Sequence, residues 1–225
     1  MSQRLPIQHA LIMAAGRGNR MRPLTDVMPK AMLPYNGSTL IGNNLLALRS
    51  CVEYVHVTVG YKSVMLSQYL MTVGVDSIFN TEGHSNSWWI SHTLMRHLDE
   101  PVLVLTCDNI TELDMEFLTN EYARLHAPAC MVVPVAPVPG IDGDYVEHTQ
   151  GVVTNIQRQT PADIYCSGIQ VLNPRQVVAN APDTEDGFYA VWNRLIARQQ
   201  VGVSMIYPKT WFSVDTLDQL VNLQK

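Results

Sequence analysis

The stretch Leu11-Ile-Met-Ala-Ala-Gly-Arg-Gly-Asn-Arg-Met-Arg-Pro-Leu-Thr25 joins a short apolar segment to a loop rich in glycine and arginine. Residues 10–13 predict a buried strand, whereas the next helical pattern begins only near Ser38 or Thr39. About 24 residues therefore lie between the two, where connections in compact domains usually take two to six. A connection of this length is usually functional, and it directs attention to the end of the first strand.

The composition predicts a single folded domain over residues 1–225. Hydrophobic residues make up 47% and charged residues 16% of the chain, which excludes a disordered protein. The net charge of −5 disfavours a nucleic-acid partner. No segment is long and apolar enough for membrane insertion, no secretion signal is present, and the four cysteines lack metal-ligand spacing. We therefore expect a cytoplasmic protein with reduced thiols. The sequence does not indicate an oligomeric state.

Strand and helix patterns alternate through the first part of the chain. Strands are expected at 54–59, 75–79, 102–106 and 130–135, and helices at 39–49, 64–71, 88–98 and 113–125. This alternation predicts an α/β fold, a Rossmann-like, mainly parallel central sheet with helices on both faces.

The pattern changes after residue 134, where 135–140 break regular structure. Strands at 145–147, 152–156 and 168–172 then follow without intervening helices. A helix at 187–197, a strand at 201–206 and a helix at 216–222 complete the chain. We expect a smaller β-rich subregion packed on the same sheet.

The loop after the first strand has the chemistry of a polyphosphate site. Gly16 and Gly18 allow the backbone to approach a ligand and turn its amides toward an anion. Four of the fifteen Lys and Arg residues lie in this loop, namely Arg17, Arg20, Arg22 and Lys30. Because Met21 occupies the last glycine position, the loop is neither a P-loop nor a dinucleotide fingerprint. The alternative is a solvated basic loop without a ligand.

Residues 11–25, followed by Pro29-Lys30 and Met32-Leu-Pro34, resemble the signature of the nucleotidyltransferases that activate sugar 1-phosphates and related phosphorylated small molecules. Asn19 replaces the usual Ser or Thr. The resemblance implies that Ala14, Ala15 and Gly16 lie against the nucleoside, and that Gly18, Asn19 and Arg20 hold the β- and γ-phosphates. It also implies that Lys30 reaches the α-phosphate or the acceptor phosphate. We expect base contacts from Thr81 and Asn86, a nucleotide-binding part over 1–134 and an acceptor-binding part over 135–225.

Two aspartates are candidate Mg²⁺ ligands. Asp108 follows the buried strand expected at 102–106, so it lies at the same edge of the sheet as the glycine-rich loop. Asp215, in Trp211-Phe-Ser-Val-Asp-Thr216, resembles the family's closing segment, whose Asp supplies a second ligand. Two carboxylates, substrate phosphates and water make an ordinary Mg²⁺ shell. The alternative for each aspartate is a helix cap or turn residue.

The reaction that this resemblance implies is attack by an acceptor phosphate on the α-phosphorus of a nucleoside triphosphate, with release of pyrophosphate. A phosphate monoester is largely dianionic at neutral pH, because its second pKa is about 6. No general base is therefore required. Catalysis would come from Arg20, Lys30 and the Mg²⁺ held by Asp108, which align and neutralise two repelling anions.

Residues 86–109 resemble the phosphocholine cytidylyltransferase branch of this family, and residues 187–193 and 211–215 resemble the aromatic-rich C-terminal half of that branch. The branch's second Asn is Ser87 here, and its motif Ser is Ile90. Five aromatic residues could form a pocket for an ammonium group through cation–π attraction, namely Trp88, Trp89, Tyr189, Trp192 and Trp211. The alternative is that Trp88 and Trp192, which lie at helical spacing with apolar neighbours, are plain core. We expect CTP and a phosphocholine-like acceptor, with a sugar 1-phosphate and UTP, CTP or GTP as the alternative.

Two other classes of function compete with a transferase. A non-catalytic nucleotide-sensing module would keep the fold, but it would not need the complete set of cationic and acidic residues. A glycosyltransferase would share a metal-binding Asp, but the glycine-arginine loop fits a triphosphate better than a diphosphate sugar.

Overall fold

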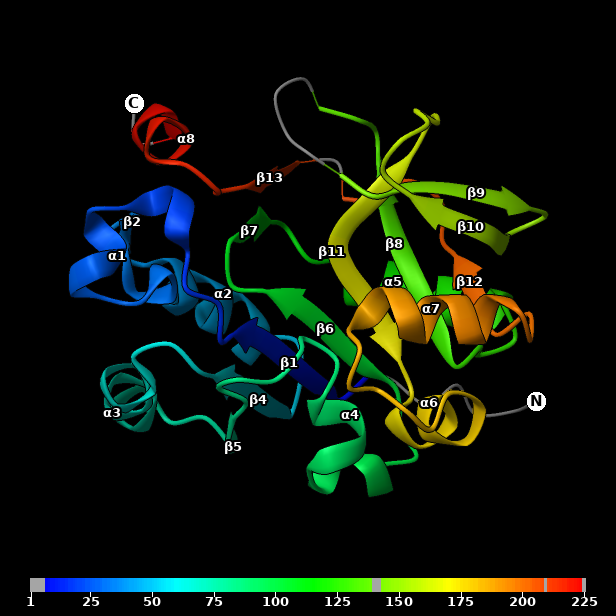
Figure 1. The fold of residues 1–225 in the computed structure, drawn as a ribbon, viewed down its shortest axis with the longest axis horizontal. Helices are drawn as coiled ribbons and strands as arrows, with labels where there is room; N and C mark the ends of the chain where they lie inside the picture. Colours follow the sequence, from blue (N-terminus) through cyan, green and yellow to red (C-terminus); the bar gives the residue numbers. More distant parts are fainter. Residues whose placement is uncertain (1–6, 139–142, 209, 224–225) are drawn as a thin grey trace.

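A nine-stranded sheet forms the centre of the computed structural model, which describes residues 7–138, 143–208 and 210–223 (Figure 1). In spatial order the strands are β5 (Ser77–Asn80), β4 (Tyr54–Val59), β1 (His9–Ala14), β6 (Val102–Thr106), β11 (Tyr165–Leu172), β8 (Cys130–Val135), β12 (Val201–Val203), β10 (Val152–Gln157) and β9 (Tyr145–Thr149). The first four are mutually parallel, and β11 is antiparallel to both β6 and β8. The predicted α/β fold is confirmed.

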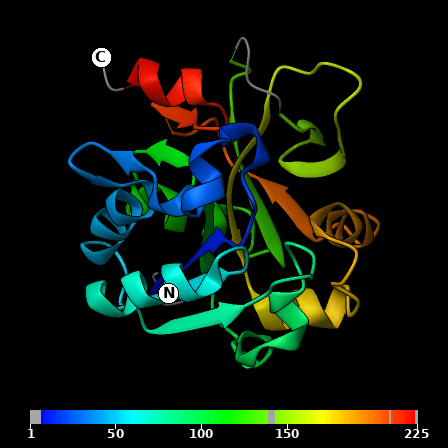
Figure 2. The same cartoon turned by 60° about the vertical axis from the view of Figure 1, so that its left-hand side comes forward.

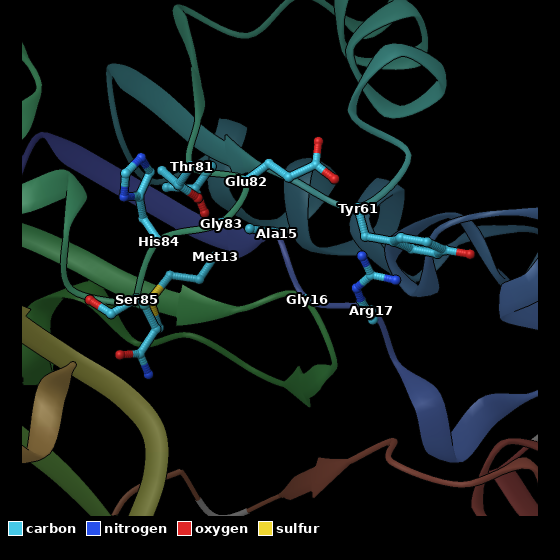
Figure 3. Close-up of a pocket in the computed structure, with 12 residues that line it drawn as sticks. Met13, Ala15, Gly16, Arg17, Tyr61, Thr81, Glu82, Gly83, His84 and Ser85 are labelled. Atoms are coloured by element: carbon cyan, nitrogen blue, oxygen red, sulfur yellow. The ribbon is translucent and has the colours of Figure 1, made fainter. Parts of the chain in front are cut away.

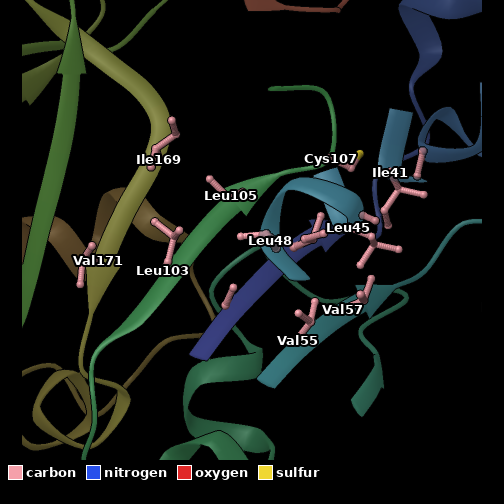
Figure 4. Packing of buried hydrophobic residues seen from close by; sticks show 14 of the residues in the cluster. Ile41, Leu45, Leu48, Val55, Val57, Leu103, Leu105, Cys107, Ile169 and Val171 are labelled. Carbon is pink, nitrogen blue, oxygen red and sulfur yellow. The ribbon is translucent and has the colours of Figure 1, made fainter. Parts of the chain in front are cut away.

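Helices cover both faces of the sheet (Figure 2). One face packs against α2 (Leu40–Arg49), α3 (Ser63–Val73) and α5 (Met115–Arg124), and the other against α4 (Trp89–His92), α6 (Pro174–Asn180) and α7 (Phe188–Ile196). Successive side chains of β1 point to opposite faces of the sheet, so Ile12 packs in the core on the first face and Leu11 in the core on the second. Figure 4 shows Leu45 and Leu48 of α2 on the strands of the first core. Each such buried side chain contributes about 1.5–3 kcal/mol to folding.

The long connection after β1 is ordered by short elements. It contains η1 (Asn19–Met21), α1 (Leu24–Val27), η2 (Lys30–Met32) and a hairpin of β2 (Pro34–Tyr35) with β3 (Ser38–Thr39). Met21 and Leu33 from this connection pack with two residues near the C-terminus. Val214 precedes α8 (Leu217–Leu223), and Leu220 lies within it. A separate small core therefore fixes the C-terminal segment against the glycine-rich loop.

A two-stranded ribbon fixes the two candidate metal aspartates. β7 (Asn109–Thr111) pairs with β13 (Trp211–Ser213), with Ser213 opposite Asn109. The amide of Val214 also donates to the carbonyl of Asp108 at 3.1 Å. Asp108 and Asp215 thus lie side by side although 107 positions of the sequence separate them.

The structure departs from the predicted elements in several places, including the short elements after β1 and the β7–β13 ribbon, which no pattern predicted. The helix expected at 88–98 is divided into α4 and η3 (Leu94–His97), because Thr93 is extended and its hydroxyl accepts from the amide of Met95. A helix that the pattern did not predict, α6, begins at Pro174 after the capping side chain of Asn173. The strand expected at 201–206 ends at Val203.

Three further expectations concern the break after residue 134, the division of the chain into two parts, and membrane-spanning helices. Residues 136–138 form no helix or strand, and 139–140 lie outside the described residues. The division into parts 1–134 and 135–225 stays a prediction, although strands from both parts interleave in one sheet. Among the described residues, no helix is long and apolar enough to cross a membrane.

Candidate active site

A cavity of about 400 Å³ lies at the carboxyl ends of β1, β4 and β5 (Figure 3). Of the predicted nucleoside-binding residues, Ala15, Gly16, Thr81 and Asn86 line it. Ala14 does not, because its side chain packs in the core while its amide donates to Thr58 Oγ1 at 3.3 Å. Figure 3 shows Arg17 and Tyr61 across the cavity from His84. The size and position fit a nucleoside at the edge of a parallel sheet.

A second cavity, of about 330 Å³, adjoins the first and shares Met13 and Gly16 with it. Its walls hold the residues that the resemblance assigns to the phosphates and the metal, namely Gly18, Asn19, Arg20, Lys30, Asp108 and Asp215. The structure therefore brings together residues from the glycine-rich loop, the end of β6 and the C-terminal segment.

Lys30 is the centre of the charged network in this second cavity. Its Nζ lies 2.5 Å from Asp108 Oδ2 and 3.0 Å from Asp215 Oδ1. Burial alone would lower the pKa of Lys30, but the negative charges of Asp108 and its neighbours outweigh burial and raise that pKa above its ordinary value. Lys30 is therefore a fixed ammonium. Arg20 extends the network, with Nη2 2.9 Å from Asp215 Oδ1.

Gly18 allows the loop to pass over Lys30. Its φ is +61°, and a Cβ at this position would lie 2.9 Å from Lys30 Cβ. A side chain here would displace the lysine from the aspartates, so the glycine has a steric role as well as a conformational one.

The other two arginines of the loop lie outside the phosphate cavity. The guanidinium of Arg17 lies 5.1 Å from the centre of the Tyr61 ring, at the wall of the nucleoside cavity. Arg22 forms an exposed ion pair with Asp26 at 3.2 Å and lines neither cavity.

The donor set fits a hard cation that also binds phosphate oxygens. Asp108 Oδ1 is buried and has no hydrogen-bond partner among the described residues. No cluster of three or more metal-binding side chains occurs among those residues, so the protein offers two carboxylates and not a complete shell. Mg²⁺ is commonly held by one or two carboxylates together with substrate phosphates and water.

The thiol beside this site is not a candidate nucleophile. Burial raises the pKa of Cys107 to about 12, so the group stays protonated at neutral pH.

Asn109 is a residue that the sequence reasoning did not select. Its side chain is buried, and neither its Oδ1 nor its Nδ2 finds a partner among the described residues. Gly168, with φ +81°, faces it, and a Cβ on that glycine would lie 3.2 Å from Asn109 Nδ2 and 3.1 Å from Thr106 Oγ1. An amide beside a candidate metal ligand was visible in the sequence, but its burial without a partner was not.

The predicted aromatic residues lie in different surroundings, although the rings of Tyr189 and Trp192 are in contact, with centroids 5.7 Å apart. Trp89 and Trp192 are 1% and 9% exposed and belong to the second core, so neither presents an open ring face. Trp88 is stacked between His84 and His92, at ring separations of 4.1 and 4.7 Å. The indole of Trp211 donates to the carbonyl of Ser167 at 2.9 Å. Tyr189 reaches a polar cluster, where its hydroxyl donates to Asp144 beside Arg158.

Sequence comparison identifies several curated relatives of this chain. A curated relative, the N-acetylmuramate alpha-1-phosphate uridylyltransferase of Neisseria meningitidis serogroup B, is 32% identical over 145 residues, which are 60% of this chain and 63% of that protein. The mannose-1-phosphate guanyltransferase of Pichia angusta is 29% identical over 180 residues, 73% of this chain and 49% of that protein. The chain thus spans about half to two thirds of the length of these two relatives.

Solved structures show the same fold at lower identity. The CTP:phosphocholine cytidylyltransferase of Streptococcus pneumoniae superposes with a TM-score of 0.76 over 98% of both chains, at 19% identity. A putative glucose-1-phosphate thymidylyltransferase from Bacillus anthracis gives 0.78 over 96% of this chain and 93% of its own, at 15% identity. The family model for the MobA-like NTP transferase domain matches residues 10–139, more than half of the chain. The chain therefore belongs to the MobA-like NTP transferase domain family.

Proposed function

We propose that this chain transfers a nucleotidyl group from a nucleoside triphosphate to the phosphate of a small acceptor and releases pyrophosphate. The observation that carries the proposal is the convergence of Lys30, Asp108 and Asp215, with Arg20, on a cavity next to a nucleoside-sized one. A purely structural ion-pair network would not need to line a cavity that adjoins a nucleoside-sized one.

In this reaction, an oxygen of the acceptor phosphate forms a bond to the α-phosphorus. The bond from the α-phosphorus to the oxygen that bridges it to the β-phosphorus breaks, and pyrophosphate leaves with that electron pair. The acceptor is largely dianionic at neutral pH, so no residue has to remove a proton. The protein's task is to hold two anions in line, and the fixed ammonium of Lys30 and the guanidinium of Arg20 supply the positive charge.

A magnesium ion belongs to this proposal. Asp108 and Asp215 would hold it, and it would supply positive charge that neutralises the triphosphate. The unpartnered Oδ1 of Asp108 supports this assignment, because a buried carboxylate oxygen without a hydrogen-bond donor is costly unless something binds it.

Sugar 1-phosphates are the first acceptor class to test. The curated relatives named above act, by their names, on N-acetylmuramate 1-phosphate and mannose 1-phosphate. A phosphocholine-like acceptor with CTP is the second class. The cluster of Tyr189, Asp144 and Arg158 favours it, because a carboxylate beside an aromatic hydroxyl can receive an ammonium group.

The test is pyrophosphate release with Mg²⁺, crossing CTP, UTP, GTP, ATP and dTTP against sugar 1-phosphates, phosphocholine and phosphoethanolamine. Release with a sugar 1-phosphate supports the first acceptor class, and release with CTP and an amine-bearing acceptor supports the second. Binding of a triphosphate without release from any pair would favour the nucleotide-sensing module over a transferase.

A further inference from the structure

The loop of residues 82–87, beside the nucleoside cavity, is hydrogen-bonded to the segment that precedes α7. The carbonyl of Thr184 accepts from Ser87 Oγ at 2.7 Å and from Ser85 Oγ at 3.2 Å. The Thr184 hydroxyl also bonds to Ser91 Oγ, and both Thr184 and Ser87 are completely buried. Residues about 100 positions apart are therefore held together by buried hydrogen bonds where these two segments meet.

Asn86 makes the contact that links these segments to both the cavity and the helix. It lines the nucleoside cavity, and its Oδ1 accepts from the backbone amide of Phe188 at 3.1 Å. Phe188 is the first residue of α7, and the preceding residue, Gly187, offers no capping side chain. Asn86 thus caps α7 from a distant part of the sequence, in place of a local N-cap.

The backbone of Asn86 is held as well, because its carbonyl accepts from the buried indole of Trp89 at 3.0 Å. With Oδ1 committed to Phe188, the Nδ2 group remains as a donor, and it has no partner among the described residues. A ligand in the nucleoside cavity that accepts from Nδ2 would polarise the amide and strengthen its bond to α7.

The helix that Asn86 caps leads to the polar cluster of the acceptor-side region. Tyr189 follows Phe188 in α7, and its hydroxyl donates to Asp144, which is also paired with Arg158. The β9–β10 hairpin that follows Asp144 is thereby connected, through one helical turn, to the wall of the nucleoside cavity.

We propose that Asn86 is a positioning residue that couples the two binding sites. Binding of the nucleotide orders the first turn of α7 through Asn86, and this ordering prepares the Tyr189–Asp144–Arg158 cluster for the acceptor. The inference rests on the proposed function for the identity of the two ligands. By linkage, the nucleotide should raise affinity for the acceptor about fivefold or more.

Two substitutions separate the two halves of the Asn86 amide. Asn86→Asp keeps an oxygen that accepts from Phe188, in a position that favours negative charge, but it loses the Nδ2 donor. Asn86→Ala loses both. Asp114→Ala is a matched control, because Asp114 Oδ1 caps α5 by accepting from the amide of Phe117 at 2.9 Å and lines neither cavity.

The experiment is hydrogen–deuterium exchange of the full chain with Mg²⁺ and either CTP or UTP at saturating concentration. In the wild type and in Asp114→Ala, we expect nucleotide to slow exchange at 11–20 and also at 184–192. In Asn86→Asp without nucleotide, residues 184–192 should exchange as fast as they do in the wild type. When nucleotide is added to this variant, exchange should slow at 11–20 but not at 184–192. In Asn86→Ala, 184–192 should exchange faster even without nucleotide.

Slowing at 184–192 by nucleotide in Asn86→Asp equal to that in the wild type would overturn the coupling. Slowing confined to 11–20 in the wild type would overturn it too, and would leave nucleotide binding intact. Slowing at both segments with no pyrophosphate release from any substrate pair would count against the transfer reaction alone. No slowing anywhere would overturn both proposals.

Discussion

The ammonium of Lys30 lies 2.5 Å from the carboxylate of Asp108, although 78 positions separate the two residues. The same ammonium lies 3.0 Å from Asp215, near the other end of the chain. One lysine therefore forms ion pairs with both candidate metal ligands at the wall of the phosphate cavity.

Replacement of Lys30 should remove activity without removing the fold. In Lys30→Met the side-chain volume is largely kept but the charge is lost, so the two aspartates repel the triphosphate. We expect pyrophosphate release to fall by about 10²–10³, the effect of removing a preorganised electrostatic group. Arg22→Met is the matched control from the same loop, because its ion pair with Asp26 is exposed, and it should keep activity within about twofold. Full activity in Lys30→Met, with an unchanged circular dichroism spectrum, would reject the assignment.

Removal of divalent cations should abolish the reaction, and Mg²⁺ should restore it. Because Asp215 is proposed as one of two protein ligands, Asp215→Asn should raise the Mg²⁺ concentration for half-maximal rate at least about tenfold. Asp218→Asn, an exposed change in the first turn of α8, serves as control and should not shift this concentration. Equal Mg²⁺ dependence in the two variants would show that Asp215 is not a ligand.

Gly168 should tolerate a side chain less well than another glycine with the same backbone conformation. In Gly168→Ala, the Cβ meets Thr106 Oγ1 at 3.1 Å and Asn109 Nδ2 at 3.2 Å, whereas at Gly37, with φ +73°, it meets nothing within 4 Å. We expect Gly37→Ala to cost about 1 kcal/mol of stability and Gly168→Ala about 1–3 kcal/mol, measured by urea unfolding. Only Gly168→Ala should also reduce turnover, because Thr106 lines the phosphate cavity. An equal loss of stability in the two variants would mean that the positive φ alone, and not the contacts with Thr106 and Asn109, makes Gly168→Ala unstable.

His56 should make the protein less stable in mild acid. Burial, together with the neighbouring His9, lowers the pKa of His56 to about 4, so between that value and about 6.5 the unfolded chain binds a proton that the folded chain does not. Stability therefore falls as pH decreases through this window, by roughly 2 kcal/mol at pH 5 for this group.

The measurement is urea unfolding of the wild type and His56→Gln at pH 7.5 and pH 5. The glutamine can still bond to His9 Nδ1, which lies 3.1 Å from His56 Nε2 in the wild type. Glu100, 3.5 Å from His9, and Asp76, which acts on His56, are unchanged in both proteins. The loss on acidification should be smaller in the variant, and an equal loss in both would assign it to other groups.

The fold was predictable because its central strands are short apolar runs between clear breaks. The strands at 54–59, 102–106 and 130–135 have the predicted bounds, and the helix at 39–49 differs by one residue, since Thr39 is its cap. Apolar spacing did not reveal the break at Thr93, which depends on one hydroxyl bonding to a backbone amide.

The site was predictable only in part, for a physical reason. The family resemblance selects Lys30, Asp108 and Asp215 one at a time, and the structure brings them together through the β7–β13 ribbon and the small core around Met21. Helical spacing cannot distinguish an aromatic cage from a core, which is why the sequence leaves Trp192 ambiguous, whereas the structure places it in the second core. The bond from Phe188 to Asn86 joins residues 102 positions apart, and no local pattern encodes it.

The most direct test of the proposed transferase follows the α-phosphate. The wild type would be incubated with Mg²⁺, an acceptor that gives pyrophosphate release, and a triphosphate labelled at the α-phosphorus, with Lys30→Met as control. The account predicts that the label moves to the acceptor in equal amount to the pyrophosphate formed, and that the variant transfers about 10²–10³ less. Label recovered as free nucleoside monophosphate, or transfer at the wild-type rate by the variant, would contradict it.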